Sequence, residues 1–99
     1  MAAAVPVHIG ALVVTLHIPA SGSLKSKRRV VKSIKDRVRA KFNVSVSEIG
    51  DHDKWQIAVL GFAMISNDKN LIAGVFENIL SLVESVGEVR VTAQQIEYL

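Results

Sequence analysis

The chain has 99 residues, of which 49% are hydrophobic and 21% charged, with a formal net charge of +3 and no cysteine. This composition excludes a disordered chain and a disulfide-stapled scaffold, and the length fits one domain spanning residues 1–99. The start of the chain lacks the basic segment of a secretory signal, and the apolar runs are far shorter than a bilayer requires. We therefore expect a cytoplasmic protein with no membrane span.

The first two elements predicted are a strand and a helix. Residues 7–18 are β-branched and apolar on both alternating faces, which is typical of a central strand. The segment PASGS then breaks this pattern. From residue 24 onward the apolar side chains recur at helical spacing, and Ser23 suits the N-cap, so a helix is predicted roughly over residues 24–42.

Two strands are predicted in the middle of the chain. Residues 43–50 alternate, with Val44, Val46 and Glu48 on one face, which indicates a half-exposed strand. Residues 56–66 are apolar on both faces and predict another interior strand. The polar segment DHDKW connects the two.

A second helix and a final strand complete the prediction. Apolar residues from Leu71 to Val86 form a helical stripe that stops before Gly87, and residues 88–98 alternate as a strand. The order is strand, helix, strand, strand, helix, strand. With right-handed crossovers it predicts an α+β, ferredoxin-like βαββαβ sandwich, in which two helices cover one face of a four-stranded antiparallel sheet.

This fold leaves one face of its two central strands without a helix. Both strands are apolar on both faces, and a large exposed apolar sheet is unusual in a monomer. We therefore expect a homo-oligomer that associates through the open sheet face or through an edge strand. The alternative is that short residues such as Gly10, Ala11 and Gly61 make this face less apolar than it looks.

Positive charge is concentrated in the first predicted helix. Residues 25–41 contain nine of the 12 basic residues and one acid, Asp36. Like charges four residues apart repel, and a face selected only for solubility would mix signs, so we interpret this concentration as a binding surface. Six of the cations fill one helical arc, which we call the basic face: Lys25, Arg28, Arg29, Lys32, Lys35 and Arg39.

The partner predicted for this surface is RNA or the ribosome. A stripe from residue 25 to residue 39 is about 21 Å long, enough to follow several phosphates. Lys27 is included with the basic face as a predicted nucleic-acid contact, although it points toward the apolar arc, where it either extends past the sheet edge or pairs with a loop acid. Base stacking on the sheet is disfavoured, because residues 60–67 lack most of the aromatic motif that it requires.

No catalytic residue, cofactor or metal site is predicted. Asp51, His52 and Asp53 offer metal-ligating atoms, but adjacent residues rarely converge on one ion. We interpret DHDKW instead as a polar hairpin anchored by a buried Trp55. The segment PASGS lacks the spacing of a phosphate-binding loop.

A second class of function stays open. Amino-acid-binding regulatory domains with this strand order dimerise edge to edge and hold effectors at helix–strand loops, where PASGS would lie. The alternative prediction is therefore a dimeric small-molecule-sensing regulatory domain, in which the charge of the helix is incidental.

Three motifs between residues 23 and 68 resemble those of a known family. The helix start carries Ser23, Leu24, Lys25, Lys27 and Arg28; the segment KFNVS follows; and Gly50, Asp51, Asp53 and Trp55 lie in a turn. These motifs closely resemble the YlxP-like family of bacterial domains of unknown function (family 503). The resemblance implies a ferredoxin-like fold and no established activity. Genes of that family often lie among those of transcription, translation-initiation and ribosome-maturation factors, which implies an RNA or ribosome setting.

Overall fold

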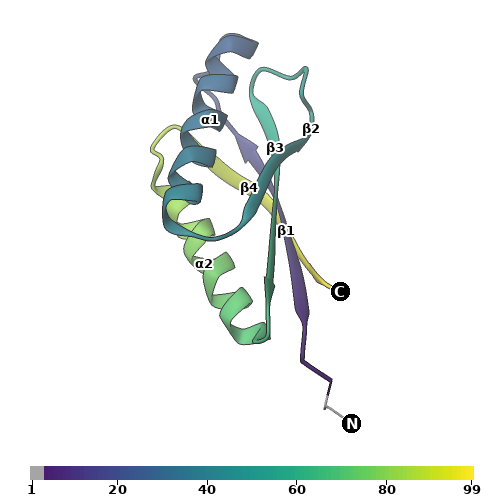
Figure 1. Ribbon diagram of the computed structural model, residues 1–99. Coiled ribbons are helices and arrows are strands. Elements are labelled where there is room, and N and C mark those ends of the chain that lie inside the picture. The colour runs from purple at the N-terminus through teal and green to yellow at the C-terminus, as the bar shows by residue number, and fades with distance from the viewer. Residues whose placement is uncertain (1–3) are drawn as a thin grey trace.

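The computed structural model describes residues 4–99, and its elements follow the predicted order. The strands and helices follow one another along the chain as the hydrophobic periodicity indicates, and the observed ends lie within a few residues of the predicted ones (Figure 1). The elements are β1 (His8–His17), α1 (Leu24–Lys41), β2 (Ser45–Gly50), β3 (Ile57–Ser66), α2 (Lys69–Ser85) and β4 (Arg90–Tyr98).

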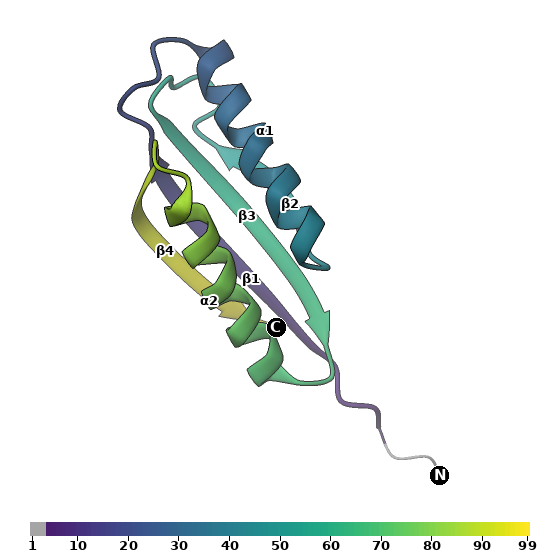
Figure 2. The same cartoon turned by 90° about the vertical axis from the view of Figure 1, so that its left-hand side faces the viewer.

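The four strands form one antiparallel sheet in the order β2-β3-β1-β4. Leu12 of β1 lies opposite Phe62 of β3 on one side and Ile96 of β4 on the other. Both helices lie on the same face of the sheet (Figures 1 and 2). The predicted ferredoxin-like sandwich is confirmed.

The core lies between the helices and the inward-facing residues of the two central strands. Leu12 and Leu60 are completely buried, as are Ile34 of α1 and Phe76 of α2. Helix α2 approaches β1 so closely at Gly10 that a Cβ atom there would lie 2.6 Å from Ile72 Cγ2. Burial of these side chains is the main favourable term in the stability of the fold.

Side-chain caps fix where the helices begin. The Ser23 hydroxyl accepts a hydrogen bond from the Ser26 amide at 3.0 Å, which confirms the predicted N-cap of α1. The Asp68 carboxylate accepts one from the Asn70 amide at 2.9 Å and begins α2. Gly87 follows the C-cap of α2, as predicted, but its φ is not positive, so it does not form a left-handed cap.

The outer face of the sheet is covered by neither helix. The prediction that one face of the two central strands lacks a helix is therefore confirmed. Three isoleucines remain exposed on this face, with Ile65 at 65%, Ile49 at 51% and Ile9 at 36% exposure. A shallow apolar hollow of about 300 Å³ is lined by Gly61 and Ile49 among others, and Ile49 packs so closely on Gly61 that a Cβ atom there would lie 3.1 Å from Ile49 Cδ1. We call this surface the open face.

Candidate nucleic-acid interface

The six residues of the basic face lie on the side of α1 that points away from the core. Val31, Ile34 and Val38 turn the opposite side of the helix toward the sheet and are buried. Five of the six cations are exposed and Lys35 is partly buried. One side of α1 packs into the core and the other side carries the cations, so the packing of the helix holds the cations in place.

Acidic residues neutralise little of this charge. Lys32 pairs with Asp36 at 2.7 Å across one turn, and both side chains are more than half exposed. The hydrogen bond from Lys32, with the positive charges of Arg39 and Lys35 added, lowers the pKa of Asp36. Among residues 4–99, five members of the basic face have no carboxylate within ion-pair distance, namely Lys25, Arg28, Arg29, Lys35 and Arg39.

Two features of the basic face are electrostatically unfavourable in the isolated chain, although Arg39 in the last turn suits the helix dipole. The i,i+4 pairs within the basic face each cost about 0.2–0.5 kcal/mol, and the first turn of α1 has no acidic residue to complement the helix dipole. An anion beside the helix would reduce both the repulsion between the cations and the unfavourable interaction with the helix dipole.

The basic face borders a groove between α1 and β2. Four cations line a space of about 400 Å³, namely Arg28, Lys32, Lys35 and Arg39, and the carboxylates of Asp36 and Glu48 also line it. The Arg39 guanidinium donates to the Val46 carbonyl at 3.4 Å, which turns this cation toward β2. A polyanion lying in the groove would therefore meet cations along one wall.

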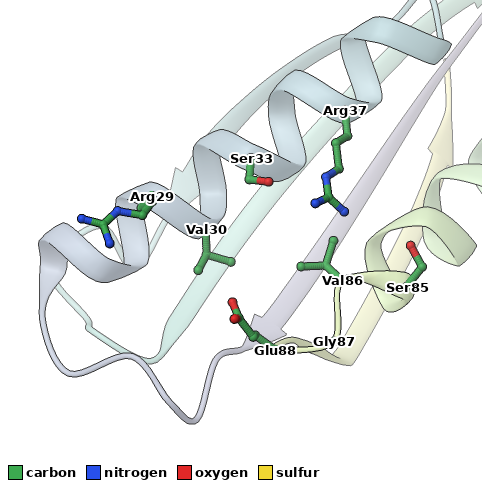
Figure 3. A pocket seen from close by; sticks show the side chains of 8 residues that line it. All are labelled: Arg29, Val30, Ser33, Arg37, Ser85, Val86, Gly87 and Glu88. Carbon is green, nitrogen blue, oxygen red and sulfur yellow. The ribbon is translucent and has the colours of Figure 1, made fainter.

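A second groove lies between the two helices, and it contains a cation that the sequence analysis did not include. The groove has a volume of about 450 Å³ and is lined by residues of α1, by the last residue of α2 and by the segment that follows it. Figure 3 shows Arg37 extending toward α2, the Glu88 carboxylate directed toward α1, and Arg29 pointing away from the gap. Helical periodicity places Arg37 on the α2 side of α1, away from the basic face, and that is the signal by which it could have been assigned to this groove.

Lys27 lies inside the protein and not on the basic face. Its side chain is 0% exposed, and its Nζ lies 3.0 Å from Glu48 Oε2. The same ammonium lies within hydrogen-bond distance of the carbonyl oxygens of Asp51 at 2.7 Å, His52 at 3.3 Å and Ile57 at 3.2 Å. Glu48 Oε2 is buried, and this ammonium is its ion partner.

These contacts correct the prediction for Lys27. Extension past the sheet edge is wrong, because the ammonium is fully enclosed. Pairing with an acid is confirmed, although that acid, Glu48, lies on β2 and not in a loop. No phosphate can reach Lys27 in this structure, so it is removed from the predicted contact residues.

The turn that follows β2 differs from the prediction at its aromatic residue. Trp55 is 55% exposed, so the expected burial of its side chain is wrong; Lys27 anchors the turn instead. Asp51 adopts a positive φ of 54° and lies 3.5 Å from Lys54, and His52 Nε2 donates to the Glu48 carbonyl at 3.0 Å. Within residues 4–99, no three potential metal-ligating side chains gather at one point. The part of the chain that the structure describes also contains no helix long and apolar enough to span a bilayer.

Fold and surface together define a small α+β domain with a cationic helix and an uncovered sheet face. The chain belongs to the family described as protein of unknown function (DUF503), which matches residues 9–96. It is 40% identical over 78 residues to the uncharacterized protein YlxP of Bacillus subtilis (strain 168), across 79% of this chain and 85% of that protein. The resemblance noted in the sequence is therefore confirmed.

Solved structures with similar folds include two designed proteins. The de novo designed protein Foldit4 has a TM-score of 0.56 at 16% identity, covering 93% of this chain and 96% of that one. The de novo designed ferredoxin-fold protein LFR1 1 has a TM-score of 0.53 at 11% identity, covering 93% and 82%. Protein YJCS has a TM-score of 0.51 at 10% identity, covering 90% and 96%. Similarity at these identities shows the fold alone.

Proposed function

We propose that this protein is a non-enzymatic binding module that docks the basic face of α1 on RNA, with ribosomal RNA as the partner and the cytoplasm as its location. The observation that supports the proposal is the set of five cations on one exposed helical face without carboxylate partners. Their mutual repulsion disfavours the free protein and is relieved when phosphates supply the counter-charge.

The geometry of α1 suits a nucleic-acid backbone better than a membrane. Lipid binding by an amphipathic helix requires a free apolar side, whereas Val31, Ile34 and Val38 of α1 are committed to the core. Lysine and arginine contacts to phosphates position a protein without reading sequence. We therefore expect tight, salt-sensitive binding with little sequence preference from the basic face.

The decisive experiment is binding to purified ribosomes and to generic RNA across a salt series. The wild type is compared with Arg28→Glu/Lys35→Glu, because both side chains lack a carboxylate partner whereas Lys32 has one. On a single strand each phosphate contact adds about 0.7 to the slope of log K against log salt, so losing two contacts flattens the slope by about 1.4.

A matched control separates the surface from net charge. Lys69→Glu/Arg90→Glu changes the net charge equally on α2 and β4, so affinity falls less and the slope stays close to that of the wild type. Binding that is insensitive to salt, or equal slopes for the two double variants, contradicts the proposal.

A sensor of amino acids is a second candidate that one cavity favours. A space of about 250 Å³ at the loop between β1 and α1 is lined by Ser26, Arg29 and Glu88 among others. An arginine and a glutamate on one cavity could bind the carboxylate and the ammonium of a free amino acid. Thermal unfolding with each amino acid tests this candidate, because a bound ligand raises the Tm by mass action and a flat response excludes that ligand at the concentration used.

A further inference from the structure

Trp55 stands out among the aromatic residues of the chain by its exposure. Phe62 and Phe76 are buried in the core, and Phe42 and Tyr98 are partly covered, whereas more than half of the Trp55 surface is open to solvent. Tryptophan is the side chain with the largest apolar surface to gain from burial. A large aromatic left in solvent is the kind of exception that indicates a binding surface.

The backbone on both sides of Trp55 is held in place. Before it, the carbonyls of Asp51 and His52 accept hydrogen bonds from the buried Lys27 ammonium. After it, the Gln56 carbonyl accepts from the Ile18 amide at 2.8 Å, and the Gln56 side-chain amide donates to the loop between β1 and α1. The indole is thus presented from a fixed hairpin and not from a loose loop.

The location of this hairpin connects it to the basic face. Lys27 lies in the first turns of α1 and reaches the hairpin directly, so Trp55 stands at the same end of the molecule as Lys25 and Arg28. Figures 1 and 2 both place the β2–β3 turn beside the beginning of α1. A backbone that follows the basic face toward the start of α1 therefore comes close to the hairpin that carries Trp55.

We infer that Trp55 is a stacking platform for one unpaired base of an RNA strand whose phosphates lie on the basic face. This inference rests on the proposed function and specifies its ligand as single-stranded RNA. Unpaired bases stack on exposed aromatic rings regardless of sequence, whereas paired bases keep their faces inside the duplex. Asp53 is exposed and lies two residues before Trp55 in the chain, so its negative charge disfavours a phosphate near this turn, which suits a base at this position and the backbone elsewhere.

The chain contains one tryptophan, so its fluorescence reports directly on this position. The wild type is titrated at fixed salt with a 12-nucleotide oligouridine and with a duplex RNA of the same length. We expect saturable quenching by the single strand and little change with the duplex. Binding of Trp55→Ala is followed by the anisotropy of a labelled RNA, because this variant has no tryptophan. Its affinity for the single strand should fall about 5- to 150-fold, which is the range expected for the loss of base–aromatic stacking. Its affinity for the duplex should stay within twofold of the wild type.

The salt series separates this inference from the proposed function. Stacking releases no counterions, so Trp55→Ala keeps the wild-type slope, whereas Arg28→Glu/Lys35→Glu flattens it. Trp55→Phe retains an aromatic ring and should recover part of the affinity for single-stranded RNA that Trp55→Ala loses. Circular dichroism checks that each variant folds. Salt-dependent RNA binding with unchanged affinity in Trp55→Ala and no quenching overturns the role of Trp55 while the basic face stands.

Two other results also overturn the inference. The absence of salt-dependent binding in the wild type removes the proposed function and this inference with it. Quenching by whole ribosomes but by no naked RNA assigns Trp55 to a protein surface instead.

Discussion

Replacing Lys27 by methionine tests the buried contacts of α1, because methionine keeps most of the side-chain length and removes the ammonium. The variant strands the Glu48 carboxylate and deprives three carbonyls of their donor. Breaking a buried ion pair from one side typically costs about 3–5 kcal/mol, and because the Glu48 side chain is 15% exposed we expect the lower end, about 3 kcal/mol. For a domain of this size each kcal/mol shifts the Tm by about 4–8 °C, which corresponds to a loss of roughly 12–24 °C.

The assay is urea and thermal unfolding followed by circular dichroism. Lys27→Met/Glu48→Leu removes the stranded carboxylate as well, so it should be more stable than the single variant, although the three carbonyls still lack a donor. Lys41→Met removes an exposed lysine from the other end of α1 and should change the stability by less than about 0.5 kcal/mol. A loss below about 1 kcal/mol for Lys27→Met, or a double variant no more stable than the single one, refutes this account of the hairpin.

Three further changes test other parts of the structure. Asp36→Asn removes the ion partner of Lys32, so that Lys32 can contact a phosphate. The affinity for single-stranded RNA should rise at low salt, and the slope of log K against log salt should steepen by about 0.7. An unchanged slope in filter binding contradicts this prediction. Gly10→Ala forces a Cβ atom against Ile72 and should lower the free energy of unfolding by about 1–3 kcal/mol. Gly74→Ala in α2 adds a Cβ atom that meets nothing within 4 Å and should raise the free energy of unfolding by about 0.5–1 kcal/mol. Equal effects of the two variants in urea unfolding would refute the close approach at Gly10. If the open face joins two copies, sedimentation velocity should give a species heavier than one chain and Val13→Lys should reduce it to a monomer, whereas a monomeric wild type refutes self-association.

The elements follow from short-range patterns that the sequence displays, and their order together with right-handed crossovers predicts the arrangement of the sheet. The alternation around Val46 places Glu48 on the inner side of β2, where the structure finds it partly buried. The periodicity of α1 likewise separates the buried valines and isoleucine from the basic face. Patterns of this kind depend on neighbours along the chain, which explains why they suffice for secondary structure and for the sides of each element.

The two errors concern residues whose surroundings are made by distant segments. Lys27 lies in the apolar arc of α1, and only the folded chain brings the carbonyls of the β2–β3 turn to its ammonium. The sequence predicts that Trp55 anchors the same turn, but Lys27 provides the anchor and the ring of Trp55 remains exposed. A sequence pattern does not show which side chain, among residues far apart in the chain, comes to anchor a turn.

The enclosed lysine also has a geometric consequence for any strand that binds. One ammonium ties the hairpin that carries Trp55 to the helix that carries the cations, so the separation of these two elements is set before a ligand arrives. A nucleotide chain that settles on both must match that built-in separation, and length, more than base identity, would then decide which fragments are accepted.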